Sequence, residues 1–319
     1  MAALWQKPAL VLAFALSSAV TEAQDNPCLQ RTVLVSVMEN TGRQVSGLKA
    51  DGFDARIGRQ KMQIKSVTPA PADRRVVLLL DVSASMGGDR VREKWPTAVA
   101  IATQVLSSAP ARISLGMIAF SDKFLDLVDF GPSARNDIAS KLQKYEGMSP
   151  LGRTPLLDTI DRAIGMFTPS RAADAIYLIS DAGDNYSKDT VDRVRERLLM
   201  SGVRLHLIYI HENSMDLPLS EDKPDIFSTL ALESGGWVLD VPASLKQKNE
   251  RVRGTVASAV QAMLNDPLVR IQFGLPHELT RWRSWDLRVL DARGRKNNKL
   301  MLLYPHFLGP KACLNNMQP

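Results

Sequence analysis

Apolar and polar positions divide the chain into three regions. Between residues 74 and 266, unbroken apolar runs such as Val76 to Leu80 alternate with longer amphipathic segments. A short apolar run bounded by turn residues is typical of a strand that is buried on both faces, and a 3.6-residue period is typical of a helix. The pattern therefore predicts an α/β domain over residues 74–266, built as a doubly wound, mostly parallel sheet.

The expected strands of this domain are residues 75–81, 112–120, 174–180, 203–210 and 236–241, with 124–130 as an antiparallel edge strand. The expected helices are residues 97–108, 134–145, 155–167, 190–200, 225–234 and 249–264. Thr154 precedes Pro155 at the start of the third helix. Because threonine is a common N-cap and proline is tolerated at the first helical position, we expect Thr154 to cap that helix.

The two flanking regions, residues 24–73 and 267–319, are rich in β-strand patterns. The expected strands are residues 32–38, 53–57, 62–67, 268–273, 285–290 and 300–304. A segment of about 40–50 residues is too short to build an independent β-sandwich core. We therefore expect the two segments to pair, so that the α/β domain is inserted in, or flanked by, a small β-sandwich.

Residues 1–23 have the pattern of a secretory signal peptide. Lys7 gives a positive start, residues 9–20 are an apolar run too short to span a bilayer, and Thr21-Glu22-Ala23 offers a cleavage site. We expect an exported protein, periplasmic or secreted, without a transmembrane segment in the mature chain. An uncleaved membrane anchor is the alternative.

Composition narrows the class of protein. The 319 residues are 45% hydrophobic and 23% charged, and the net charge of +6 does not by itself indicate a nucleic-acid partner. The two cysteines, Cys28 and Cys313, lie near the two ends of the mature chain. An exported protein reaches an oxidising compartment, so we expect a disulfide between them, with two free thiols as the alternative. The absence of a Cys-x-x-Cys pair excludes a zinc ribbon.

A basic and aromatic run begins at residue 281. It reads Arg281-Trp282-Arg283-Ser284-Trp285 and is followed by Arg293, Arg295, Lys296 and Lys299. Such a run can contact an anionic glycan or lipid surface in the cell envelope, but it can equally be a solvated β-hairpin with packed tryptophans. In an exported protein we expect no nucleic-acid partner.

The candidate chemistry follows the first buried strand. Asp81, Ser83 and Ser85 stand at alternate positions directly after an apolar run. Open α/β sheets bind their ligands outside the carboxyl ends of the strands, and alternate positions of an extended loop point to one side. One carboxylate and two hydroxyls suit a hard cation such as Mg²⁺. The alternative is that these residues only cap loops.

These residues carry a resemblance to a known family. Asp81-Val82-Ser83-Ala84-Ser85, Thr154 in a Gly/Pro-rich loop before a helix, and Asp181 after a later apolar strand resemble the von Willebrand factor A domain and its metal-ion-dependent adhesion site. The residues on either side of the domain resemble exported bacterial proteins related to von Willebrand factor A.

The resemblance implies a role for each residue of the site. Ser83 and Ser85 would ligate a divalent cation (Mg²⁺, or Mn²⁺ or Ca²⁺) directly, Thr154 directly or through water, and Asp81 and Asp181 mostly through water. One coordination position would stay open for an Asp or Glu carboxylate of a partner protein. Ala182 departs from the family, where glycine commonly follows the last aspartate, and its methyl group would lie at the rim of the site.

The function expected from the resemblance is a protein-binding module for cation-dependent adhesion, not an enzyme. An alternative is a structural component of the envelope whose metal site is occupied but not adhesive. A metal-dependent hydrolase is a third possibility, because a cation can activate water, but the sequence contains no recognisable motif that positions a general base.

Overall fold

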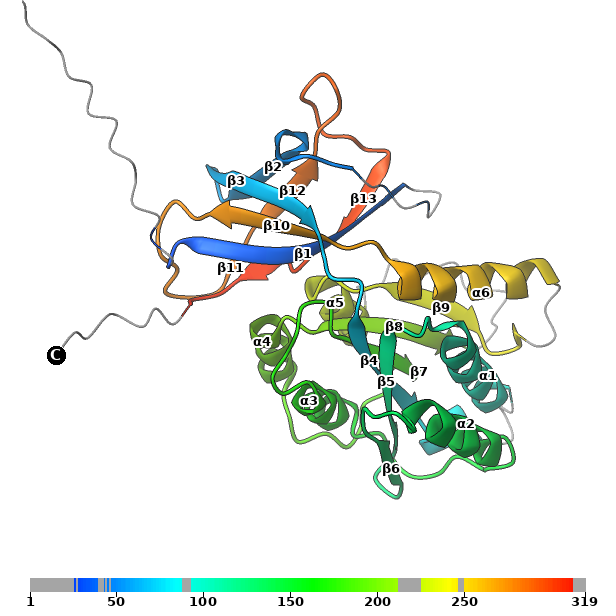
Figure 1. Ribbon diagram of the computed structural model, residues 1–319. Coiled ribbons are helices and arrows are strands. Elements are labelled where there is room, and N and C mark those ends of the chain that lie inside the picture. Colours follow the sequence, from blue (N-terminus) through cyan, green and yellow to red (C-terminus); the bar gives the residue numbers. More distant parts are fainter. Residues whose placement is uncertain are drawn as a thin grey trace, which may run out of the picture.

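The structure is a computed structural model that describes residues 26, 28–39, 43, 45, 47–87, 93–211, 225–245 and 250–311. A six-stranded, mostly parallel sheet with helices around it lies next to a six-stranded antiparallel sheet (Figure 1). The expected fold class, an α/β domain flanked by a β unit, is therefore confirmed. The predicted signal peptide and Cys313 lie outside the described residues, so cleavage and the disulfide remain predictions.

The mostly parallel sheet has the strand order β6-β5-β4-β7-β8-β9. Its strands are β4 (Arg74–Asp81), β5 (Ile113–Phe120), β6 (Leu125–Val128), β7 (Ala175–Ser180), β8 (Arg204–His211) and β9 (Val238–Pro242). Only β6 is antiparallel to its neighbour, at the edge of the sheet. Strands β4 and β7 pair in the centre, where Leu79 lies opposite Leu178. The chain therefore brings the residues that follow these two strands to the same edge.

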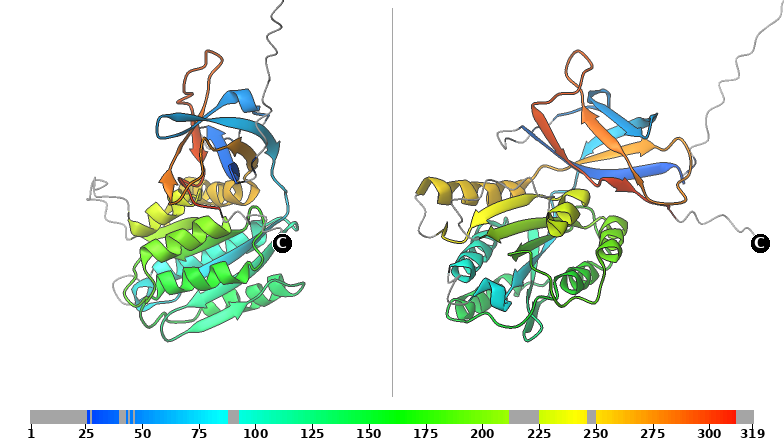
Figure 2. Two further views of the ribbon diagram at one scale, coloured as in Figure 1. Left: turned by 90° about the vertical axis from the view of Figure 1, so that its left-hand side faces the viewer. Right: turned by 180° about the vertical axis from the view of Figure 1, so that it is seen from behind.

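Helices cover both faces of this sheet (Figure 2). One face packs against α1 (Lys94–Ser108), α2 (Ala134–Tyr145) and α6 (Glu250–Asn265), and the other against α3 (Leu156–Met166), α4 (Val191–Ser201) and α5 (Ile226–Glu233). The side chains of β4 alternate between the two cores: Leu78 and Leu80 face the first, and Val77 and Leu79 the second. Burial on both faces explains the unbroken apolar run of this strand.

The antiparallel sheet joins the two flanking regions of the chain. Its strand order is β12-β2-β3-β10-β1-β13. The strands are β1 (Gln30–Glu39), β2 (Phe53–Ile57), β3 (Gln60–Pro69), β10 (Val269–Gly274), β12 (Asp286–Val289) and β13 (Leu300–Leu303). Because β1 pairs with both β10 and β13, the N-terminal segment is completed by the C-terminal one, as expected.

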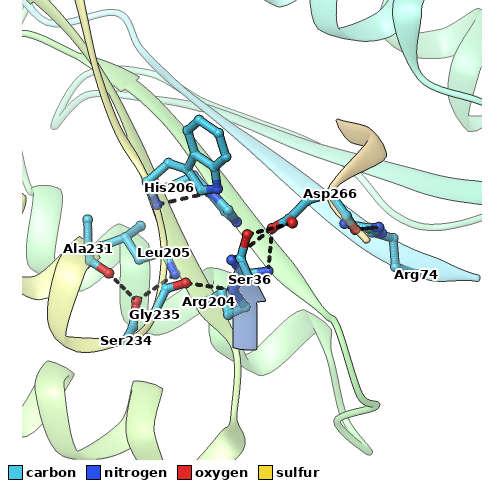
Figure 3. Close-up of polar contacts among 10 residues, drawn as sticks. Ser36, Arg74, Arg204, Leu205, His206, Ala231, Ser234, Gly235 and Asp266 are labelled. Atoms are coloured by element: carbon cyan, nitrogen blue, oxygen red, sulfur yellow. Dashed lines mark hydrogen bonds and ion pairs between the residues drawn. The ribbon is translucent and has the colours of Figure 1, made fainter. Parts of the chain in front are cut away.

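A buried polar cluster connects the β unit to the α/β domain (Figure 3). Asp266, which follows α6, is 1% exposed and lies within 3.2 Å of the Arg204 guanidinium at the start of β8. Ser36 of β1 donates a hydrogen bond of 2.6 Å to the same carboxylate, and Arg74 of β4 donates one of 2.8 Å to the Asp266 carbonyl. The β unit is therefore fixed at the amino ends of the parallel strands, which leaves their carboxyl ends uncovered by it.

The basic and aromatic run is part of this β unit. Arg283–Ser284 form β11, which pairs with β14 (Phe307–Leu308), and neither strand was expected from the sequence. Trp285 is 6% exposed and its ring centroid lies 5.1 Å from that of Phe273. Trp282 donates a hydrogen bond of 3.3 Å to Glu196 of α4. These contacts favour packed tryptophans over a surface that grips an anion.

No helix within the described part of the chain combines the length and the apolar character that crossing a bilayer requires. Among the described residues, η1 (Ala50–Gly52) and η2 (Ala84–Met86) are short 3₁₀ helices. The second interrupts the loop after β4, which the sequence predicted to be extended.

Candidate metal centre

The two central strands deliver two aspartates to one edge of the sheet. Asp81 ends β4 and is fully buried, whereas Asp181 directly follows β7. Asp81 accepts hydrogen bonds from the Ser83 N–H (2.9 Å) and the Ser180 hydroxyl (2.7 Å), one on each carboxylate oxygen. Burial raises the pKa of Asp81 to about 6, although these hydrogen bonds oppose the shift and the nearby Asp181 adds to it. Asp81 is thus held within the protein and orients the backbone of the serine loop.

The serine hydroxyls meet although the loop is not extended throughout. Ser83 is extended (φ −70°, ψ 164°), but the 3₁₀ helix begins at Ala84 and includes Ser85. The expectation of a wholly extended loop is therefore wrong, because the backbone forms a short helix that is closed by its own hydrogen bonds. The Ser83 and Ser85 hydroxyl oxygens still lie 3.1 Å apart. Adjacent oxygen ligands of an octahedral Mg²⁺ lie about 2.9 Å apart, so the two hydroxyls have nearly the required spacing.

The loop that carries Thr154 is held between the loops after β4 and β7. The Gly152 carbonyl accepts a hydrogen bond of 2.9 Å from the Ala84 N–H. The Thr154 N–H donates to the Asn185 side chain at 2.9 Å, and the Thr154 carbonyl accepts from the Asn185 N–H at 3.2 Å. Thr154 is 1% exposed, and its hydroxyl forms no hydrogen bond with any described residue. This hydroxyl, on a residue that is almost entirely buried, is the candidate for a third ligand.

Thr154 does not cap α3, contrary to expectation. The helix begins at Leu156, Pro155 is its N-cap residue, and no side chain at that position forms a capping bond. The first backbone N–H groups of the helix instead donate to side chains of the loop after β7. The Leu157 N–H donates to the Ser187 hydroxyl at 2.9 Å, and the Leu156 N–H donates to the Asp184 carboxylate at 3.4 Å. A cap supplied from a distant loop leaves no signal in the local sequence. Capping by this loop gives Asp184 a structural role and leaves the Thr154 hydroxyl available to bind a ligand.

Asp122, which follows β5, clamps the same loop. Its carboxylate accepts hydrogen bonds from the Arg153 N–H (2.6 Å) and side chain (3.0 Å), and the Arg153 N–H is the main cause that lowers the pKa of Asp122. Gly152 has φ +92°, and a Cβ atom there would lie 2.4 Å from the Asp122 carboxylate. Glycine is therefore required for this close approach.

Lys94 is a residue of the site that the sequence did not reveal. Its ammonium lies 2.9 Å from the Asp181 carboxylate and 3.4 Å from the Ser85 carbonyl, and the residue is only 8% exposed. The other Asp181 oxygen accepts a hydrogen bond of 3.1 Å from the Ser85 hydroxyl. Lys94 lay outside the expected helix because α1 begins three residues earlier than predicted, and its partner is 87 residues away in sequence.

Ala182 adopts a left-handed backbone conformation. Its φ is +58°, a region that favours glycine, and its N–H donates a hydrogen bond of 2.9 Å to the Ser180 hydroxyl. This geometry gives a physical reason for glycine at the position. The side chain is partly buried against the core on the α3 face, so its methyl group contributes to packing as well as to the rim.

The rim around Thr154 exposes apolar and basic groups together. Leu151 is 53% exposed and Tyr186 is 43% exposed, and both belong to the loops that flank the site. The Arg153 guanidinium stacks 3.6 Å from the centre of the Tyr186 ring. A surface of this kind suits a partner that presents a carboxylate beside apolar side chains.

The donor set fits a hard divalent cation. The Ser83 and Ser85 hydroxyls lie 3.1 Å apart, with the Asp81 and Asp181 carboxylates hydrogen-bonded to the same loop. Thr154 adds a third hydroxyl on the adjoining loop, and oxygen ligands are those that Mg²⁺, Mn²⁺ and Ca²⁺ prefer. The described residues contain no cluster of three or more His, Cys, Asp or Glu side chains arranged to hold a metal ion. Any metal here would therefore be bound by a hydroxyl-rich set.

Comparison with known proteins gives one family match. Residues 76–184 match the von Willebrand factor type A domain family, a range that contains all five predicted metal-site residues. No curated protein matches the chain.

Several solved structures are similar to the chain. The conserved hypothetical protein BatB from Bacteroides thetaiotaomicron is 16% identical over 59% of this chain and 98% of its own, with a TM-score of 0.43. A von Willebrand factor type A protein from Catenulispora acidiphila is 12% identical over 90% and 74% (TM-score 0.44), and manganese-loaded TRAP from Plasmodium vivax is 12% identical over 75% and 95% (TM-score 0.43). Likenesses this distant indicate no function.

Proposed function

We propose that this chain, a von Willebrand factor type A domain protein, binds a partner protein through a divalent cation held by Ser83, Ser85 and Thr154. Domains of this family commonly mediate protein–protein interaction and are generally not enzymes. The observation that carries the proposal is the 3.1 Å separation of the Ser83 and Ser85 hydroxyls in front of Asp181. This spacing is close to that of two adjacent ligands of one small cation.

The residues of the chain have distinct roles in this proposal. A bound Mg²⁺, Mn²⁺ or Ca²⁺ would supply an electrophilic position for an Asp or Glu carboxylate of the partner. Ser83 and Ser85 provide neutral ligands, so the positive charge of the ion is not cancelled by direct contact with carboxylates. Asp81 holds the serine loop through the Ser83 N–H, and Asp181 accepts from the Ser85 hydroxyl. In this proposal both carboxylates position the serine ligands and do not contact the ion directly.

The exposed rim supports a protein as the ligand. Leu151 and Tyr186 offer apolar area, and Arg153 offers a positive charge to an acidic segment. An apolar anchor beside a charged contact is a common arrangement at the centre of protein interfaces.

We further propose that the protein is exported, to a periplasm or beyond the cell, and that Cys28 and Cys313 form a disulfide. The pattern of residues 1–23 supports export. The Arg31 side chain donates hydrogen bonds to the carbonyls of Cys28 (2.7 Å) and Gly309 (3.3 Å). The segment that carries Cys28 therefore lies against the chain four residues before Cys313, which supports a closing disulfide.

The experiment that tests the binding function compares three purified proteins. We expect the wild-type chain to bind Mn²⁺ in a titration and to capture an envelope protein in Mg²⁺ but not in EDTA. The double variant Ser83→Ala/Ser85→Ala should lose both properties because it removes two ligands. Ser107→Ala, which changes an exposed serine of α1, is the matched control and should retain both.

Other outcomes would point to the alternative functions. Metal binding with identical capture in Mg²⁺ and EDTA would indicate an envelope component with an occupied, non-adhesive site. Metal-dependent hydrolysis of a model ester or phosphate would indicate an enzyme. Absence of Mn²⁺ binding by every protein would refute the metal site itself.

A further inference from the structure

We propose that Lys94 is an internal competitor of the divalent cation, so that the metal binds only as the lysine gives up the Asp181 carboxylate. This inference rests on the proposed function, because it concerns how the same site is loaded. It assigns to Lys94 a control of metal affinity that the resemblance of the motif does not supply.

The position of Lys94 is unfavourable for a cation without a strong partner. It is the first residue of α1, a helix of 15 residues, where the peptide dipoles place partial positive charge. The side chain is also buried, with 9% of its surface exposed, and a buried ammonium is costly unless it is paired. The 2.9 Å contact with Asp181 meets this requirement.

The carboxylate that stabilises Lys94 is one that the metal also requires. Asp181 binds the lysine through one oxygen and the Ser85 hydroxyl through the other. The same serine is linked to Ser83 at 3.1 Å, so the ammonium, the carboxylate and the two hydroxyls form one connected chain of contacts. The ammonium already neutralises part of the negative charge that would attract a divalent ion.

A divalent ion on the two serines would lie close to the lysine. Two cations near one carboxylate repel each other, and the repulsion is stronger where the charged groups are buried, as the Lys94 and Asp181 side chains are (9% and 8% exposed). Lysine has a long, flexible stem and can swing its ammonium towards solvent more easily than a rigid side chain can move. We therefore infer two states of the site: in one the Lys94 ammonium compensates the charge of Asp181, and in the other a metal ion on the serine hydroxyls does.

Removing the charge of Lys94 should tighten metal binding. For Lys94→Met, we expect the dissociation constant for Mn²⁺, measured by calorimetric titration, to fall at least about tenfold relative to the wild type. Lys94→Arg keeps the charge and should stay within about threefold of the wild type. Lys141→Met, which breaks the ion pair of Lys141 with Asp126 on α2 and β6 (2.5 Å), is the matched control and should not change the constant.

A second readout does not depend on the titration. Without its lysine, Asp181 is a poorly compensated carboxylate in EDTA, so the melting temperature of Lys94→Met should drop in EDTA and recover in Mn²⁺. The wild type should show a smaller rise on adding Mn²⁺, because its lysine already serves as the cation. A variant that loses stability equally in EDTA and in Mn²⁺ would show that the ion pair is only structural and would overturn the inference.

The outcomes separate this inference from the proposed function. Equal Mn²⁺ affinity of the wild type and Lys94→Met overturns the competition and leaves the metal site standing. Binding by Lys94→Met but not by the wild type supports competition in its strongest form and refutes metal-dependent adhesion by the natural chain. Binding by neither protein refutes the metal site, and the inference with it.

Discussion

The two ends of the parallel sheet both bury charged groups, but they leave them in different states. At the amino end, Asp266 is paired with Arg204 and Ser36 from two separate units of the protein. At the carboxyl end, Asp181 is paired with the long, flexible side chain of Lys94, beside the hydroxyls of the candidate metal site. There the Thr154 hydroxyl forms no hydrogen bond with a described residue. Charged groups that are fully paired within the protein, as at the amino end, hold its two units together. Polar groups whose hydrogen bonds are not all made within the protein, as at the carboxyl end, can bind a ligand.

The largest expected effect comes from the amino end. Asp266→Ala leaves the Arg204 guanidinium, 3% exposed, without its carboxylate. Breaking a buried ion pair by removing one partner costs about 3–5 kcal/mol, and we expect a loss of this size in the free energy of unfolding measured with denaturant. The metal affinity of the folded variant should be unchanged, since the site lies at the other end of the sheet.

The control for this variant is an exposed ion pair of the β unit. Asp291→Ala removes the partner of Arg295, which has 67% of its side chain exposed, and should cost less than about 1 kcal/mol. If Asp266→Ala were no more damaging than Asp291→Ala, the amino end would not fix the two units together.

A smaller, pH-dependent effect is expected from His206, on β8 two residues after Arg204. His206 is buried against Tyr177, and its Nδ1 accepts a hydrogen bond of 3.2 Å from the Trp237 N–H. Burial, and then the charges of Arg204 and Arg74, lower the pKa of His206 well below its ordinary 6.5. In the folded protein the imidazole is therefore neutral where the unfolded chain already binds a proton.

The sign of the pH dependence follows from this difference. The contribution of His206 to stability is fully present above about pH 6.5 and is lost as the pH falls below it, by up to about 1.4 kcal/mol per pH unit. We expect the stability advantage of the wild type over His206→Asn, measured by unfolding from about pH 8 to about pH 5, to shrink as the pH falls. A constant difference would contradict a neutral, buried His206.

The smallest effect concerns the backbone at the carboxyl end. Ala182→Gly relieves the left-handed strain at φ +58°, worth about 1–2 kcal/mol, but adds freedom to the unfolded chain. We expect a net gain of roughly 0.5 kcal/mol in the free energy of unfolding. Ala100→Gly, within α1, is the control and should lose about 1 kcal/mol. A loss for Ala182→Gly as well would show that its methyl packing outweighs the strain.

The sequence by itself determined the central sheet and the main elements of the candidate site. The apolar runs that became β4 and β7 are buried on both faces, and this burial is visible as an unbroken run of large aliphatic residues. The polar residues that follow such a strand can lie only at its carboxyl end. Ser83 and Ser85 were therefore predictable as neighbours, and the pairing of the flanking segments followed from their shortness.

Only the tertiary structure decided which partners complete the site. Lys94 reaches Asp181 across 87 residues, Ser187 caps α3 in place of Thr154, and Asp266 ties the β unit to the domain. Each of these is a hydrogen bond or ion pair between side chains and segments far apart in sequence. Local pattern reports which face of an element is buried, because burial selects apolar residues at a regular period. The local pattern does not indicate which polar groups contact each other, because such contacts depend on how the loops pack in three dimensions.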